Sequence, residues 1–245
     1  MKSNSLNKLL PFFIFLFFLL IFLLSSGGHS DHYDGVVAFL KVENMAINGT
    51  PAENINSPSL KFFGFDLETH IGIKASMQAY YLYEKNKEQF IEQETSREEF
   101  REEFLESTDF ENFYGPNYIL LPIVATPLYI ISTILDTSPV NFVPLFLNST
   151  IIAINAVLVF FIGTKLYCSQ RIGFVLSVLF GTTTFMWPYV TSMFHRPLAI
   201  LFLLVFLYLI LNHKQKISIK KSFFAGISLG FMVFLILYFR FSYQD

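Results

Sequence analysis

The chain has 245 residues, of which 53% are hydrophobic and 31 are phenylalanine, and its formal net charge is −2. Charged residues make up 15% of the chain, against about 25% in an average soluble domain. These values argue against a water-soluble enzyme, a disordered chain and a nucleic-acid-binding protein, which needs a basic surface. The single cysteine, Cys168, excludes an intrachain disulfide and a cysteine-rich metal site.

The charges are unevenly distributed along the chain. Residues 1–30 contain two lysines and no acidic residue, and residues 137–244 contain eight basic residues and no acidic residue. Eleven of the 19 acidic residues lie between Glu84 and Glu111. This distribution predicts an all-α integral membrane protein with one large polar insertion.

The first apolar run covers residues 9–24 and is interrupted only by Pro11. A helix of this length rises about 24 Å, close to the roughly 30 Å hydrocarbon core of a bilayer. Lys2 and Lys8 before the run also fit a cleaved signal peptide. Because later segments return to the bilayer, we interpret residues 1–26 as an N-terminal membrane anchor helix.

The polar region 27–117 is too long for a simple connector, and we expect it to form an extracytoplasmic loop. Residues 31–47 predict a short amphipathic helix. Residues 76–112 predict a strongly acidic helical part, whose dense charge indicates a solvated face. Asn48-Gly-Thr50 matches the N-glycosylation pattern, which is weakly specific.

Five more apolar runs follow, so hydropathy alone counts six spans. If all six cross, the short segments carry four basic residues on the cytoplasmic side and six outside. If residues 118–135 do not cross, the balance becomes eight inside against two outside, in line with the positive-inside rule. The eight are Lys2, Lys8, Lys165, Arg171 and the four lysines of residues 214–221, and the two are Arg196 and Arg240.

We therefore expect about five transmembrane helices, with the N-terminus cytoplasmic. Four of them form a bundle within residues 144–240, and the expected third span of the chain covers residues 172–190. Residues 118–135 become an interfacial or re-entrant segment, which Pro122 and Pro127 support because each removes a backbone donor. An ordinary kinked span is the alternative for this segment, giving six.

Two polar clusters border the predicted spans on their outer side. Ser30-Asp31-His32-Tyr33-Asp34 follows the first span, and a carboxylate there suits a general base because partial burial raises its pKa. A simple helix cap is the alternative. Phe194-His195-Arg196-Pro197 precedes the fourth span. Arg196 suits a phosphate and His195 a proton transfer, with contact to lipid headgroups as the alternative.

Soluble-enzyme motifs such as the Walker loop and HExxH are absent from the sequence. Four features, in order along nearly the whole chain, resemble the GT-C superfamily of integral-membrane glycosyltransferases, which includes protein mannosyltransferases and aminoarabinose transferases. They are the acidic cluster with its helix to Asn48, Tyr114-Gly-Pro-Asn-Tyr118-Ile-Leu-Leu-Pro122 with Pro127-Leu-Tyr, Gly163-Thr-Lys-Leu-Tyr-Cys-Ser-Gln-Arg171, and Gly181-Thr-Thr-Thr-Phe-Met-Trp187-Pro188-Tyr189.

The resemblance implies transfer of a sugar from a polyprenyl-phosphate carrier to an extracytoplasmic acceptor, at the cell membrane. It implies a direct displacement that needs no nucleotide site, and no set of metal ligands stands out. The family's second polar site is often acidic, whereas the matching positions here hold a histidine and an arginine. The implied residues are Asp31, Asp34 and His195 for catalysis, and Arg196, Lys61 and Lys74 for substrate binding.

The chain is shorter than most members of that family. We therefore expect a truncated or inactive copy, or a half that needs a partner chain to supply the missing helices. A non-catalytic multi-pass subunit that binds a partner through its outer loop is the alternative function. A small transporter is disfavoured, because transporters usually place ionisable residues inside their spans and these predicted spans contain almost none.

Overall fold

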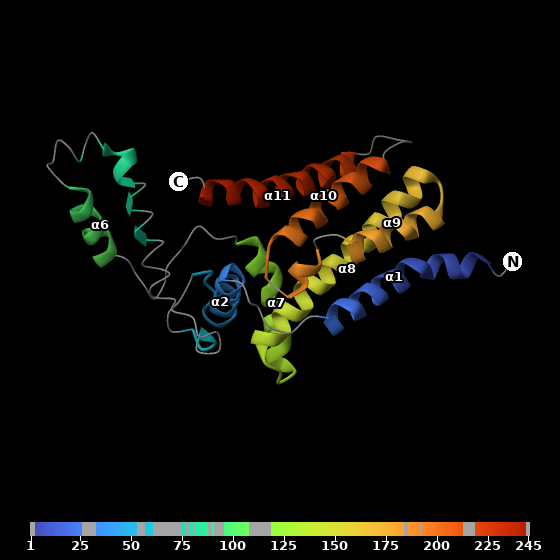
Figure 1. Ribbon diagram of the computed structural model, residues 1–245, viewed down its shortest axis with the longest axis horizontal. Helices are drawn as coiled ribbons and strands as arrows, with labels where there is room; N and C mark the ends of the chain where they lie inside the picture. Colours follow the sequence, from blue (N-terminus) through green and yellow to red (C-terminus); the bar gives the residue numbers. More distant parts are fainter. Residues whose placement is uncertain are drawn as a thin grey trace.

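The computed structural model describes residues 3–25, 33–52, 57–60, 75–76, 79–80, 82–87, 90, 96–107, 119–183, 186–191, 193–212 and 219–243. In this part of the chain all regular structure is helical, which confirms the all-α prediction (Figure 1). The helices are α1 (Ser3–Ser25), α2 (Tyr33–Asn48), α6 (Arg97–Glu106), α7 (Leu120–Ile134), α8 (Pro139–Tyr167), α9 (Gln170–Thr183), the 3₁₀ helix η1 (Trp187–Thr191), α10 (Arg196–Leu211) and α11 (Ile219–Tyr243).

Five long helices form a bundle around α8. Helices α8 and α10 run in one direction, and α1, α9 and α11 run in the other (Figure 1). Helix α8 packs against α1, α9 and α10, and α10 packs against α11. The core between α1 and α8 is built from buried apolar side chains, among them Phe18, Phe22, Ile152, Ala156 and Phe160.

Glycines bring α9 close to its neighbours. A Cβ atom on Gly173 would lie 2.6 Å from the backbone carbonyl oxygen of Phe160 on α8. A Cβ atom on Gly181 would overlap the ring of Phe18 on α1. Both approaches are far closer than van der Waals contact, so α9 needs glycine at these positions to pack as it does.

The two ends of the bundle differ in charge. One end carries four exposed cations, Lys165, Arg171, Lys220 and Lys221, and we call it the basic end. The Lys165 ammonium donates a hydrogen bond to Oδ1 of Asn212, which joins the α8–α9 turn to the end of α10. Arg196 lies at the opposite end, where α10 begins (Figure 1).

Helices α2 and α7 pack on each other and on α8. Their shared core contains Phe39, Val42, Leu121, Ala125 and Val143, all fully or almost fully buried. The predicted amphipathic helix at residues 31–47 is therefore observed as α2. Residues 118–135 were predicted to be interfacial or re-entrant, and α7 is a continuous helix through Pro127. Its 15 residues span about 22 Å.

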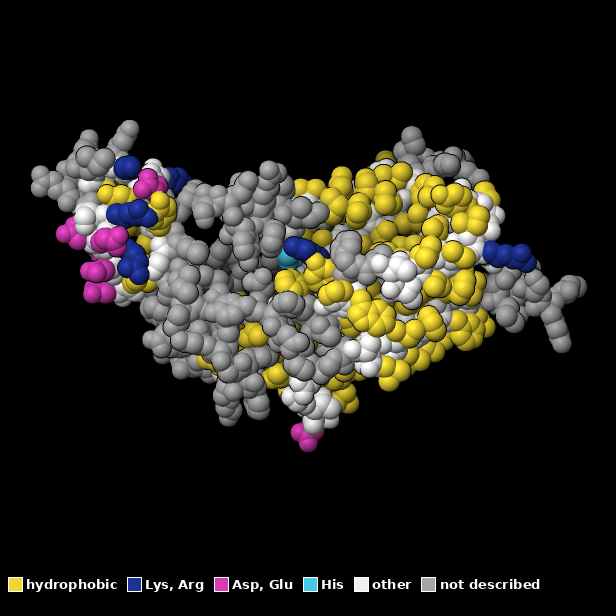
Figure 2. All heavy atoms as spheres, in the orientation of Figure 1, with side chains coloured by type: hydrophobic (Ala, Val, Ile, Leu, Met, Phe, Trp, Pro, Cys, Tyr) yellow, Lys and Arg dark blue, Asp and Glu magenta, His cyan; other side chains and the backbone are white. Residues whose placement is uncertain are grey.

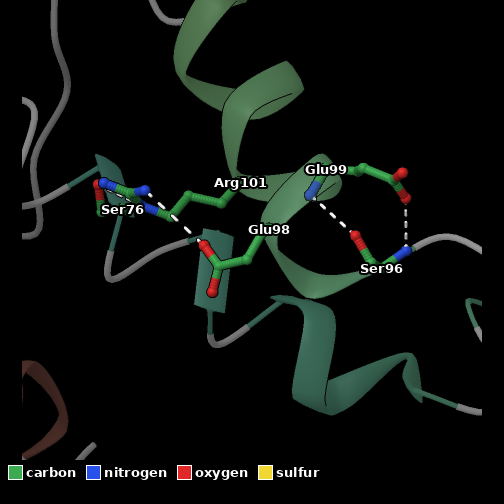
Figure 3. Close-up of polar contacts among 5 residues, drawn as sticks. All are labelled: Ser76, Ser96, Glu98, Glu99 and Arg101. Carbon is green, nitrogen blue, oxygen red and sulfur yellow. Dashed lines mark hydrogen bonds and ion pairs between the residues drawn. The ribbon is translucent and has the colours of Figure 1, made fainter.

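The acidic part of the chain contains α6, which begins with a capping box. The backbone N–H of Glu99 donates to Oγ of Ser96, and the N–H of Ser96 donates to Oε2 of Glu99 at 2.8 Å (Figure 3). Arg101 reaches Oγ of Ser76 at 3.3 Å. No residue of α6 is buried, as the prediction of a solvated helix requires.

The aromatic residues of this acidic part are nevertheless in contact with one another. The rings of Phe90 and Phe100 have centroids 4.6 Å apart, and those of Tyr83 and Phe90 stack at 5.1 Å. Phe100 of α6 therefore packs with Tyr83 and Phe90, which precede the helix in the chain, in a small aromatic cluster.

The prediction of one span over residues 172–190 is wrong in its length. Helix α9 ends at Thr183, and Trp187–Thr191 form a separate 3₁₀ helix that contains Pro188. Among the described residues, α8 alone is both long and apolar enough to cross a bilayer by itself. Leu9–Ser25, Leu120–Ile134 and Arg196–Leu211 are shorter apolar helices.

Candidate functional site

The structure describes only part of the site that the sequence predicts. Asp31, Lys61 and Lys74 lie outside the described residues. Asp34 lies in the first turn of α2, but its side chain is also outside the described part of the structure. His195 and Arg196 are both described, at the start of α10.

Arg196 is the first residue of α10, and its side chain is exposed. Its Nη1 donates a hydrogen bond to the hydroxyl of Tyr189 on η1 at 2.7 Å. Its Cζ lies 5.7 Å from the centre of the same ring, within the range of a cation–π contact. A guanidinium carries five N–H donors in a planar fork, which matches the oxygens of a phosphate or carboxylate. Tyr189 thus orients an exposed cation.

His195 is the N-cap residue of α10 and is only 5% exposed. Burial lowers the pKa of His195 to about 4, and the positive charge of Arg196 acts in the same direction. The imidazole is therefore neutral at pH 7. With so low a pKa, it is a weak base for the proton transfer that the sequence suggested.

Two buried asparagines of α8 hold η1 and the start of α10. Nδ2 of Asn148 donates to the carbonyl oxygen of Tyr189 at 2.9 Å, and Nδ2 of Asn155 donates to that of Pro197 at 3.0 Å. Both side chains are completely buried. Asn148 thus supplies a donor to a carbonyl of the 3₁₀ helix, and Asn155 supplies one to a carbonyl in the first turn of α10. The sequence analysis missed both residues, although two amides seven positions apart in an apolar helix are a usable signal.

Aromatic rings from α1 and η1 lie at the same end of the bundle as Arg196. The rings of Phe22 and Trp187 meet edge to face, with centroids 5.4 Å apart. Those of Tyr189 and Phe194 are in the same arrangement at 5.5 Å. The end of α1 and the segment before α10 are therefore in contact.

Glu43 on α2 is the buried carboxylate of the described residues. Four donors point at it: the hydroxyls of Ser57, Ser59 and Tyr129, and the backbone N–H of Ser59. These four hydrogen bonds use the acceptor capacity of both carboxylate oxygens. Glu43 is thus a structural residue that joins α2, residues 57–60 and α7. Within the described parts of the chain, histidine, cysteine and acidic side chains form no group of three suited to a metal ion.

No protein-family model matches the sequence, and no curated protein or solved structure gives a significant match to the chain.

Proposed function

We propose that the protein is a multi-pass membrane protein related in design to the GT-C glycosyltransferases, which transfers a sugar from a polyprenyl-phosphate carrier to an extracytoplasmic acceptor. The observation that carries this proposal is the position of Arg196. An exposed guanidinium, oriented by Tyr189, lies at the end of a bundle whose sides are apolar.

The surface of the bundle supports insertion in a bilayer. Yellow, hydrophobic side chains cover much of the bundle face in Figure 2, whereas soluble proteins rarely expose large contiguous apolar patches. Exposed apolar residues occur on each of the five helices of the bundle. They include Phe12, Phe13 and Phe17 of α1, Phe174, Val175 and Leu179 of α9, and Phe223, Phe224 and Phe231 of α11.

Helix lengths are compatible with this placement. Helix α1 has 23 residues and α11 has 25, which correspond to about 34 and 38 Å. Helix α10 has 16 residues, or about 24 Å. Helix α9 is shorter, and η1 extends the chain in the same direction to the end that carries Arg196. The five-span arrangement of the sequence analysis is the one that we propose.

The chemistry of this end suits a lipid-linked phosphate. The hydrocarbon chain of the carrier would lie against the apolar sides of the bundle, and its phosphate would lie at the membrane surface within reach of Arg196. The aromatic rings of Trp187 and Tyr189 suit this depth, because amphipathic rings favour the membrane–water interface. Arg196 would stabilise the phosphate as negative charge develops on its leaving oxygen.

The proposed reaction is a direct displacement at the anomeric carbon. The acceptor oxygen forms a bond to that carbon as the bond between the carbon and the carrier's phosphate oxygen breaks. The proton of the acceptor hydroxyl passes to a carboxylate, for which Asp31 is the first candidate and Asp34 the second. Lys61 and Lys74 remain candidates for additional phosphate contacts. His195 is neutral and buried, so we assign it to shaping the start of α10 rather than to proton transfer.

Binding of a polyprenyl phosphate to the purified full chain in detergent tests the proposal. Arg196→Gln should weaken binding at least about tenfold, since hydrogen bonds to charged groups contribute about 1.5–3 kcal/mol. Arg101→Gln on the exposed helix α6 is the matched control and should bind like the wild type. A chain that binds no polyprenyl phosphate, or an Arg196→Gln variant with unchanged affinity, contradicts the proposal.

One observation favours the alternative function, a non-catalytic multi-pass subunit. No residue of helix α6 is buried and the helix is strongly acidic, which fits a non-catalytic subunit that binds a basic partner surface. Under this alternative, deletion of residues 96–107 abolishes partner capture, and Asp31→Asn has no effect. Under the proposed function, Asp31→Asn abolishes sugar transfer and leaves lipid binding nearly unchanged.

A further inference from the structure

We infer that the basic end of the bundle is a binding surface for anionic phospholipid headgroups. Lys165, Arg171, Lys220 and Lys221 come from three different helices, and all four side chains are exposed. The inference rests on the proposed membrane placement of the bundle, but not on the proposed sugar transfer.

The fold brings these cations together from distant parts of the sequence. The α8–α9 turn places Lys165 and Arg171 on either side of Cys168 and Ser169. The hydrogen bond from Lys165 to Asn212 joins this turn to the end of α10, after which α11 begins with Lys220 and Lys221 in its first turn. The N-terminal end of α1 lies on the same side of the bundle (Figure 1).

No acidic residue neutralises this surface from its own helices. Residues 137–244, which contain α8 to α11, include no aspartate or glutamate. A lone exposed ion pair would contribute little, but four cations on helices without acidic residues create a local positive potential. Each ammonium also has three donors, so the bond to Asn212 leaves Lys165 with donors for a second acceptor.

The chemistry of the surroundings selects a phospholipid over a soluble anion. Exposed apolar side chains lie within a few positions of the cations in the sequence, among them Leu166, Ile172, Ile219, Phe223 and Phe224. A ligand for this surface therefore combines a negative headgroup with hydrocarbon, which describes an anionic phospholipid in the leaflet that meets the basic end. Basic residues beside a membrane helix contribute to such binding in proportion to their number.

The test uses the full chain purified in a nonionic detergent. Short-chain phosphatidylglycerol and phosphatidylcholine of equal chain length are titrated in, and thermal unfolding is followed, because a ligand of the native state raises the unfolding midpoint. Phosphatidylglycerol should raise the midpoint at low concentration and phosphatidylcholine should not. The double variant Lys220→Gln/Lys221→Gln should need about 30-fold more phosphatidylglycerol, at about fivefold per charge.

The matched control is Lys85→Gln/Lys87→Gln, which removes two exposed lysines from the polar region and should leave the titration unchanged. Equal responses to both lipids, or an unchanged titration of the Lys220→Gln/Lys221→Gln variant, overturns the inference. An equal rise with inorganic phosphate overturns it as well, since the surface is then a general anion site. Extraction of membranes at alkaline pH is measured first, and release of the wild-type chain contradicts the membrane placement itself. If the chain stays in the membrane but phosphatidylglycerol does not raise the unfolding midpoint, this inference alone is contradicted.

Discussion

The hydroxyl of Tyr129 on α7 donates a hydrogen bond to Oε1 of Glu43 on α2, at 3.2 Å and across 86 positions of the sequence. Both residues are buried. Burial raises the pKa of Tyr129 to about 12, and the negative charge of Glu43 acts in the same direction. The hydroxyl therefore stays protonated, and remains a donor, throughout the range in which the protein is handled. This contact links α2 in the polar region to α7, which packs on α8 of the bundle.

The first prediction concerns this link. Tyr129→Phe removes one donor from a buried carboxylate, and we expect a loss of about 1.5–3 kcal/mol in the attachment of α2 to α7. Hydrogen exchange of the α2 amides should therefore accelerate. Tyr167→Phe, at an exposed tyrosine near the basic end, is the control and should leave exchange unchanged. Unaltered protection of α2 in Tyr129→Phe would show that Ser57 and Ser59 alone secure Glu43.

The second prediction concerns the packing of α9 on α8. Gly173→Ala places a methyl group against the Phe160 carbonyl oxygen, and a backbone atom cannot rotate away. We expect destabilisation by about 1–3 kcal/mol, as for other overpacked sites. Gly226→Ala is the matched comparison, because a Cβ atom added there would meet no other atom within 4 Å. That change should be neutral or stabilising by up to about 1 kcal/mol. Thermal unfolding in detergent compares the two, and equal effects would contradict the observed helix contact.

The third prediction concerns the asparagine that fixes the segment before α10. Asn148→Leu deprives the Tyr189 carbonyl oxygen of its donor, so η1 should shift and carry the Tyr189 ring away from Arg196. Polyprenyl-phosphate affinity should then fall without any change in charge. Asn141→Leu, at an exposed position of the same helix, is the control. If Asn148→Leu lowers the unfolding temperature but not the affinity, Tyr189 does not position Arg196.

The fourth prediction is a dependence of stability on pH. The folded-state pKa of His195 is about 4, below the value of about 6.5 for an unfolded chain. Between these values the unfolded state binds more protons, so the free energy of unfolding rises with pH. The stability supported by neutral His195 is thus present above a pH of about 6.5 and is lost as the pH falls towards about 4. The unfolding temperature of His195→Gln should therefore fall less over this pH range than that of the wild type. Identical pH profiles for the variant and the wild type would show that His195 is not buried.

Much of the helical framework could be predicted because apolar runs and charge agree on it. Residues 31–47 correspond to α2, and residues 197–211 lie within α10. The end of α9 was missed because apolar residues continue beyond Thr183. Met186 and Val190 are buried against α1 and α8, although neither lies in an α-helix. Hydropathy does not distinguish an α-helix from a 3₁₀ segment with the same burial.

Only the charged residues of the site could be predicted from the sequence. His195 and Arg196 stand out in an apolar stretch, whereas their neighbours depend on contacts that no local pattern contains. Asn148 contacts Tyr189, which lies 41 positions later in the sequence. The contact forms because the chain runs along α8 and returns along α9 to the end of the bundle where α8 begins. The role of Glu43 was missed for a similar reason, since its donors come from residues 57–59 and from α7.

The central claim is that the bundle crosses a membrane with its basic end in the cytoplasm and Arg196 on the other side. Cys168, the single cysteine of the chain, is exposed at the basic end and reports directly on this arrangement. In sealed right-side-out vesicles, a membrane-impermeant maleimide should label Cys168 only after permeabilisation. On a Cys168→Ser background, Glu102→Cys in the polar region should be labelled without permeabilisation. Labelling of Cys168 in sealed vesicles as fast as in permeabilised ones would contradict the account.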